Sequence, residues 1–96
     1  MLEMFFDPQS VAVIGASTNP EKLGHGILAN LIDSGFEGKL YPINPGADEI
    51  LGLTCYASVL DVPGPVEMAV IVVPEKFVPS VLRESGEKGV KGAIII

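Results

Sequence analysis

One stretch of the sequence decides the fold: Val11-Ala-Val-Ile-Gly-Ala-Ser-Thr-Asn-Pro-Glu-Lys-Leu-Gly24. It begins as a short, apolar, β-branched run (11–15), which is typical of a buried strand that ends at Gly15. A polar loop follows, and the segment 23–34 then carries apolar residues at helical spacing. A strand that runs through a glycine turn into a helix places unpaired backbone N–H groups at the positive end of the helix dipole. Such a place holds phosphates well, so the stretch predicts a site for a nucleotide or a nucleotide-bearing cofactor.

Strands and helices continue to alternate along the rest of the chain. The pattern predicts strands at 39–43, 53–56, 68–73 and 92–96, a helical turn at 57–61 and an amphipathic helix at 77–86. Alternation of this kind indicates parallel β/α units with right-handed crossovers. We therefore predict an α/β fold with a Rossmann-like, doubly wound parallel sheet in the order 3-2-1-4-5, with its crevice between strands one and four.

The last predicted strand, 92–96, reads as a buried strand with nothing after it. We interpret residues 1–96 as one domain, a fragment of a longer chain that is truncated at this strand.

The bulk composition excludes several classes of protein. The chain has 96 residues, 48% of them hydrophobic, and a net charge of −6. An acidic chain is a poor nucleic-acid binder and has no electrostatic attraction to membranes. The first eight residues do not resemble a signal peptide, and no apolar run is long enough to span a bilayer. The single cysteine rules out an internal disulfide and favours the cytoplasm, and no Cys/His cluster suggests a metal site.

Residues of the first loop are the leading candidates for binding phosphate. Gly15 lets the backbone turn sharply and lets a diphosphate approach closely, although it could also be an ordinary turn glycine. Ser17, Thr18 and Asn19 can donate hydrogen bonds to phosphate or ribose oxygens, or else cap the helix. Lys22 is the only cation near the loop, where its alternative role is that of a solvated surface lysine.

The loop does not match the dinucleotide fingerprint. In Gly15-Ala-Ser17 a serine stands where the second glycine of G-x-G-x-x-G belongs. A nicotinamide dinucleotide site also requires an acidic residue at the end of strand two, where this chain has Asn44 followed by Pro45. The pattern therefore disfavours NAD.

The single histidine, the single cysteine and two glycines of the first predicted helix are better explained by structural roles than by catalysis. His25 lies in the first turn of a helix, where a lone histidine is more often structural or exposed than catalytic. Cys55 lies in a short apolar segment and reads as a small buried hydrophobe. Gly24 indicates close packing of the helix on the sheet, whereas Gly26 is merely tolerated. We assign no catalytic residue and no metal ligand, which makes the domain a binder.

An ordered series of segments along the whole chain resembles a known family. The matching segments are Ser10-Val-Ala-Val-Ile-Gly-Ala-Ser17, Lys22-Leu-Gly24, Tyr41-Pro-Ile-Asn-Pro45, Glu49-Ile-Leu-Gly-Leu53, Tyr56-Ala-Ser-Val-Leu-Asp61, Ala69-Val-Ile-Val-Val-Pro74 and Gly89-Val-Lys-Gly92. Together they resemble the N-terminal CoA-binding domain of ADP-forming acyl-CoA synthetases of the acetate–CoA ligase type. The matching domain of the succinyl-CoA synthetase alpha subunit is similar at a greater distance.

The resemblance implies that CoA lies across the carboxyl ends of the strands, with its phosphates near the first loop. The CoA-binding residues that it implies are Gly15, Ala16, Ser17, Thr18, Asn19, Lys22, Asn44, Pro45, Val73 and Pro74. In the succinyl relative a lysine follows the Pro-Gly after strand two; Ala47 stands near that place here, so one phosphate contact is not matched. The family's phosphorylated histidine lies in a later domain, and His25 does not match it.

The resemblance also implies partners and an activity. The partners are CoA or acyl-CoA and the remaining synthetase domains or a beta subunit, with no nucleic acid and no membrane. The whole enzyme would interconvert acyl-CoA, ADP and phosphate with free acid, CoA and ATP, and this chain would not be catalytic alone. One alternative is a CoA-binding regulatory module that stands alone or is fused to an acetyltransferase. Another is an NAD(P)-binding oxidoreductase domain.

Overall fold

The computed structural model describes residues 8–96, so the expectation about a signal peptide falls almost wholly outside the described residues. The elements, in chain order, are β1 (Ser10–Ile14), α2 (Leu23–Asp33), β2 (Lys39–Ile43), β3 (Glu49–Ile50), β4 (Leu53–Thr54), η1 (Val59–Asp61), β5 (Met68–Ile71), η2 (Glu75–Phe77), α3 (Val78–Lys88) and β6 (Gly92–Ile95). Both predicted helices and the helical turn are present, and their ends lie within about two residues of the predicted ones.

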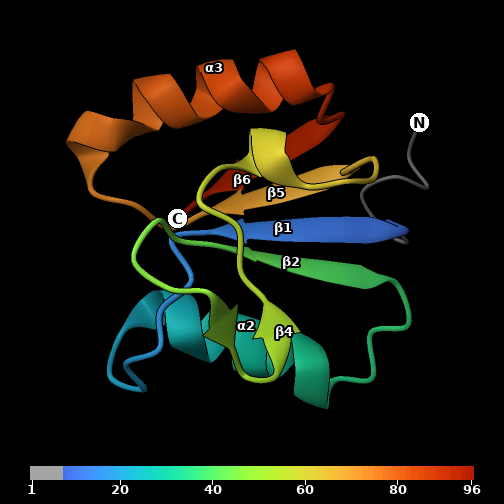
Figure 1. The fold of residues 1–96 in the computed structure, drawn as a ribbon, viewed down its shortest axis with the longest axis vertical. Coiled ribbons are helices and arrows are strands. Elements are labelled where there is room, and N and C mark those ends of the chain that lie inside the picture. The colour runs from blue at the N-terminus through green and yellow to red at the C-terminus, as the bar shows by residue number, and fades with distance from the viewer. Residues whose placement is uncertain (1–7) are drawn as a thin grey trace.

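A four-stranded parallel sheet in the order β2-β1-β5-β6 forms the middle layer (Figure 1). The helix α2 covers one face of the sheet, and α3 with η1 covers the other. In register, Ile14 at the end of β1 stands between Ile43 of β2 and Ile71 of β5. The prediction of an α/β, Rossmann-like parallel sheet is confirmed, as is the relative order of the four strands that the sheet contains.

The prediction of a third sheet strand at residues 53–56 is wrong. Residues 53–56 do not extend the sheet; Leu53–Thr54 instead pairs antiparallel with Glu49–Ile50 as a separate hairpin. Its two-residue turn has φ of 52° at Leu51 and 81° at Gly52, the twist that closes a tight antiparallel hairpin. The connection from β2 is also shorter than the dozen or so residues that a parallel crossover needs. Only Tyr56 reaches the sheet, through a single parallel bridge to Ile43.

The last strand is present as predicted, but it is not buried. β6 pairs with β5 as predicted, but it forms the outer edge of the described sheet and is not buried. Ile94 is 49% exposed and Ile95 is 54% exposed. The sequence pattern correctly predicted a strand. It does not show whether other elements cover that strand, and this decides whether it is buried.

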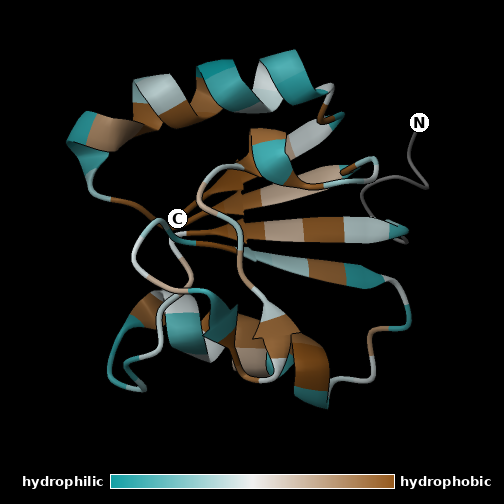
Figure 2. Cartoon of the chain, in the orientation of Figure 1, coloured by the Kyte–Doolittle hydropathy of each residue, from teal (hydrophilic) through white to brown (hydrophobic). Residues whose placement is uncertain are grey.

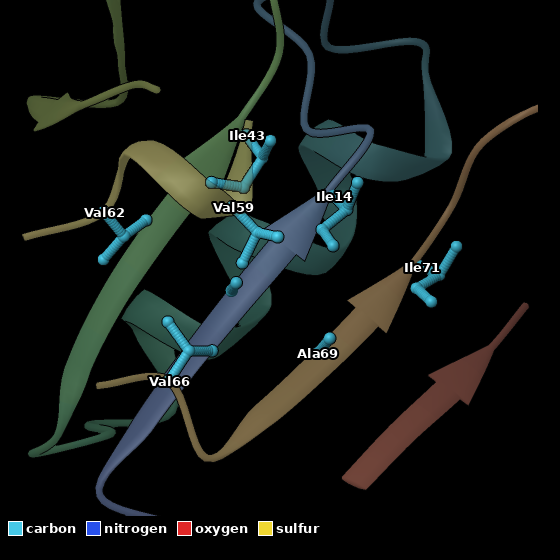
Figure 3. Packing of buried hydrophobic residues seen from close by; sticks show 8 residues of the cluster. Ile14, Ile43, Val59, Val62, Val66, Ala69 and Ile71 are labelled. Atoms are coloured by element: carbon cyan, nitrogen blue, oxygen red, sulfur yellow. The ribbon is translucent and has the colours of Figure 1, made fainter. Parts of the chain in front are cut away.

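The central strand β1 is buried on both faces and divides the core into two layers. Ala12 and Ile14 face η1 and α3, while Val11 and Val13 face α2 and the hairpin. Figure 3 shows the first of these layers gathered over β1, with Val59 next to the ends of β1 and β2. In Figure 2 the carboxyl-terminal parts of the strands are hydrophobic, whereas the amino-terminal ends of β1 and β2 and the outer side of α3 are hydrophilic. The first layer includes Ile14, Ile43 and Ile71 at the carboxyl ends of β1, β2 and β5, and the second includes Ala16 just after β1.

Candidate functional site

A cleft of about 520 Å³ opens at the carboxyl ends of the strands. Its walls come from the loops after β1, β2 and β5, the start of α2 and one side of α3. The chain passes from β1 to β2 on one side, and β5 lies on the other side of β1. The cleft therefore lies where the strand order reverses, the usual position of a ligand site in open α/β sheets.

Eight of the ten residues that the sequence analysis assigned to binding line this cleft. They are Gly15, Ala16, Ser17, Lys22, Asn44, Pro45, Val73 and Pro74. The other two, Thr18 and Asn19, are exposed and do not line it. The three predicted loops therefore meet at one place, while Thr18 and Asn19, in the outer part of the first loop, are exposed and lie outside the lining.

Gly15 occupies a position that only glycine fits. Its φ is +100°, which other residues rarely adopt, and a Cβ here would overlap the carbonyl oxygen of Val72 in the loop after β5. Its own N–H donates to the oxygen of Ile43, 3.0 Å away. The chain thus turns out of β1 while it touches both neighbouring strand ends, which brings the loops after β1 and β5 together in the cleft.

The start of α2 supplies one positive charge and two free backbone donors. Lys22 precedes the helix in an extended conformation and makes no side-chain cap. The N–H groups of Leu23 and Gly24 have no hydrogen-bond partner among residues 8–96. A Cβ on Gly24 would overlap the carbonyl oxygen of Gly15, so the predicted close packing at Gly24 is found, but against the loop after β1 and not against the sheet itself. An anion at this place would meet one ammonium group and the positive end of the helix dipole.

The side chain of Asn44 is used within the protein. Its Nδ2 donates to the oxygen of Ala16 at 2.8 Å, and its Oδ1 accepts from the N–H of Gly46 at 2.7 Å. An amide bonded at both ends ties the loop after β1 to the loop after β2. Asn44 therefore shapes the cleft, whether or not it also contacts a ligand.

The first loop is closed by its own side chains. Ser17 Oγ accepts from the N–H of Asn19, and Asn19 Oδ1 accepts from the N–H of Glu21, both at 3.0 Å. These bonds make the side-chain oxygens turn-forming acceptors. The hydroxyl hydrogen of Ser17, which lines the cleft, can still be donated.

One side of α3 also lines the cleft, and the sequence analysis missed it. The residues are Ser80, Val81 and Glu84 of α3 and Phe77 at the end of η2 just before it, and their spacing is that of one helix face. Glu84 accepts a 2.6 Å hydrogen bond from the hydroxyl of Ser58. Apolar residues at helical spacing are usually interpreted as a face that packs on the core. The signal for a second role of this face was the presence of two polar residues on it, Ser80 and Glu84.

Neither His25 nor Cys55 is arranged as a reactive group. The Nδ1 of His25 lies 2.9 Å from the oxygen of Ser17, in a half-buried position. Cys55 is buried and its Sγ donates to the oxygen of Asn44 at 3.5 Å. Burial raises the pKa of the Cys55 thiol, and the charge of Asp48 adds to this, while the backbone contact at Asn44 opposes it. The thiol therefore stays protonated at neutral pH.

Residues 8–96 contain neither a candidate metal cluster nor a helix that could cross a membrane. No three or more His, Cys, Asp or Glu side chains within residues 8–96 are grouped as a metal ion would need. Within the same range, neither helix has the length and apolarity that crossing a bilayer demands.

Comparison with known proteins places the chain among CoA-binding proteins. A family model described as a CoA binding domain matches residues 9–96. The alpha subunit of ADP-forming acetate–CoA ligase I from Pyrococcus furiosus is 58% identical over 99% of this chain. The chain spans only 21% of that subunit, and 14% of a similar ligase from Archaeoglobus fulgidus.

Solved structures agree with the family match. A dinucleotide-forming acetyl-coenzyme A synthetase from Ca. Korarchaeum cryptofilum, in complex with phosphate and ADP, superposes with a TM-score of 0.98 at 52% identity; the match covers all of this chain and 21% of that one. A conserved hypothetical protein from Pyrococcus furiosus has a TM-score of 0.84 at 42% identity, with 92% of this chain and 74% of that one covered. The expected family is thereby confirmed: this chain belongs to the CoA-binding domain family, in the form that occurs in ADP-forming acetate–CoA ligases.

Proposed function

We propose that the chain binds coenzyme A in the cleft at the carboxyl ends of β1 and β5. The observation that carries this proposal is the junction of the first loop with α2, where Gly15 lets backbone donors come close to a ligand and Lys22 adds a positive charge. Free N–H groups at the helix start suit the diphosphate of CoA. All ten residues assigned above remain the proposed contacts, with Thr18 and Asn19 reached only from the outer rim.

The size and polarity of the cleft support this proposal. Its volume lies within the roughly 300–1,000 Å³ that is usual for ligand pockets. It has Lys22 at the α2 side and Glu84 at the α3 side. A diphosphate is favoured near the lysine and repelled by the carboxylate. We therefore place the diphosphate against α2 and the uncharged parts of CoA toward α3.

A comparison of CoA with NAD tests the proposal. A nicotinamide dinucleotide site uses a carboxylate after strand two to bind ribose hydroxyls. Asn44 stands there, and its side chain already bonds to Ala16 and Gly46. Calorimetric titration of the purified protein should show CoA binding more tightly than NAD. Equal or tighter binding of NAD would contradict the proposal.

We further propose that the chain is the CoA-binding part of a cytoplasmic ADP-forming acyl-CoA synthetase. Its similarity to the ligases extends over essentially the whole chain, which supports this reading. In such an enzyme CoA is a substrate, and the remaining domains or a second subunit would supply the phosphoryl carrier and the nucleotide site. The full natural protein should form ATP from acetyl-CoA, ADP and phosphate with Mg²⁺ present; its failure to do so with any acyl-CoA would contradict this.

A second candidate is a CoA binder without ligase chemistry. It is favoured by the hypothetical protein from Pyrococcus furiosus, of which this chain covers 74%. Such a protein leaves little chain for further catalytic domains. Reading the complete gene separates the two candidates, because a ligase must also encode, or be accompanied by, an ATP-binding domain.

A further inference from the structure

Side chains from outside the first loop hold two of its carbonyl groups. Asn44 Nδ2 donates to the oxygen of Ala16 at 2.8 Å, and His25 Nδ1 contacts the oxygen of Ser17 at 2.9 Å. A carbonyl oxygen only accepts, so the ring of His25 must carry its hydrogen on Nδ1. One donor comes from the loop after β2 and the other from the first turn of α2.

The carbonyl of Gly15 is also fixed, by packing. The Cα of Gly24 lies so close to it that a Cβ would overlap the oxygen. Three consecutive carbonyl groups, those of residues 15, 16 and 17, are therefore turned toward protein atoms that satisfy or confine them.

Because the peptide unit is planar, each fixed carbonyl group also fixes the direction of the N–H group of the next residue. In a trans peptide the N–H points opposite to the carbonyl of the preceding residue, and the described chain has no cis peptides. The three carbonyls thus set the directions of the N–H groups of Ala16, Ser17 and Thr18. None of these three donors has a hydrogen-bond partner among residues 8–96, and Ala16 is fully buried in the cleft lining. Of the three residues only Ala16 is buried, and a buried donor without a partner is rare, so its N–H is the one for which a ligand oxygen would matter most.

We propose that His25 and Asn44 are positioning residues that present the N–H groups of residues 16–18 to the diphosphate of CoA. This inference rests on the proposed function. In this role the two side chains act through the loop and not on the ligand, whatever other contact Asn44 makes with CoA; they lock the peptide planes before the ligand arrives, so that binding does not have to order the loop. Without the donors, the loop could turn a carbonyl oxygen toward the phosphates, and that oxygen would repel them.

His25 allows the sharper test, because it can be replaced by residues of similar size that either keep or remove the hydrogen-bond donor. Asparagine places its Nδ2 where the histidine places Nδ1, so His25→Asn keeps the donor. His25→Leu has nearly the same branched shape without a donor. His25→Gln carries its amide one bond further out, near the position of the histidine Nε2. The three variants can be compared by CoA titration of the full-length protein, with a thermal melt of each to show that it is folded.

We expect His25→Asn to bind CoA like the wild type, and His25→Leu and His25→Gln to bind about 5- to 10-fold more weakly, because each loses one oriented hydrogen bond. Normal binding by a folded His25→Leu would overturn the proposal. Equal weakening in all three variants would overturn it as well, because it would show that the imidazole itself contacts CoA. Absence of CoA binding by the wild type would overturn the proposed function and this inference together.

The tautomer gives an independent check that does not involve CoA. In ¹⁵N-labelled protein at a pH where His25 is neutral, the ring should show hydrogen on Nδ1 and a free Nε2. Hydrogen on Nε2 would contradict the bond to Ser17 on which the proposal depends.

Discussion

Gly24 and Gly26 lie two residues apart on α2 but in very different surroundings. A Cβ on Gly24 would collide with the carbonyl of Gly15, whereas a Cβ on Gly26 would meet nothing within 4 Å. Gly24→Ala should lower the free energy of unfolding by about 2 kcal/mol, because helix or loop must move. Gly26→Ala, the matched control, should raise it by about 0.5–1 kcal/mol, because alanine favours the helix. Urea unfolding of both variants measures this, and a neutral Gly24→Ala would contradict the close packing.

Lys22 can be tested against another exposed lysine. Lys22→Ala should weaken CoA binding about two- to fivefold, since an exposed ionic contact contributes little, and the loss should shrink at high salt. Lys39, at the other end of β2, does not line the cleft, so Lys39→Ala should bind CoA normally. Equal effects of both substitutions in a titration would indicate only a general charge effect.

The raised pKa of Cys55 predicts a pH dependence of stability. Burial keeps the folded thiol protonated to a higher pH than the unfolded one. Its contribution is therefore fully present below the ordinary pKa of an unfolded thiol, and it is lost as pH rises from that value toward the higher folded pKa. The free energy of unfolding should fall over that range in the wild type and fall less in Cys55→Ala. Parallel pH profiles of the two proteins would contradict this.

At the scale of elements, α3 is held to the short helix η1 by polar contacts as well as by the core. Ser58 caps η1 by accepting from the N–H of Leu60, and its hydroxyl donates to Glu84. Lys88 adds a bond to the oxygen of Val62. These ties hold α3 at a fixed distance from the strand ends, and so they fix one wall of the cleft.

Ser58→Ala should therefore lower the free energy of unfolding by about 1–2 kcal/mol, because it removes a cap and a hydrogen bond to a carboxylate. Ser80→Ala is a suitable control, since the Ser80 hydroxyl donates only to Phe77 at the start of the same helix. Its effect should stay within about 0.5 kcal/mol. Denaturant unfolding compares the two, and equal losses would show that the tie to α3 contributes nothing.

At the scale of the whole molecule, the chain should have no ligase activity of its own. The reaction needs a phosphoryl carrier, and the only histidine of the sequence is His25. One nitrogen of its ring is bonded to the first loop, in the wall of the site where CoA would lie. The 96-residue polypeptide, incubated with acetyl-CoA, ADP, phosphate and Mg²⁺, should form no ATP. Turnover that disappears in His25→Ala would contradict this.

Local pattern in the sequence was sufficient for the first strand, its glycine turn and both helices, but the tight hairpin of residues 49–54, which is also local, was not predicted. The apolar run 11–15, its glycine turn and the helix after it predicted a central strand and its loop, because period and turn chemistry are local properties. The order of motifs predicted the family. Gly15 could be assigned because a sharp turn after a buried strand requires a residue without a Cβ.

Only the tertiary structure decided which surfaces face one another. It left β6 exposed at the edge and brought one side of α3 into the cleft. It also showed that Asn44 and His25 hold the first loop from positions 28 and 8 residues away. A pattern along the chain does not encode such contacts, because they depend on how separate elements pack in space.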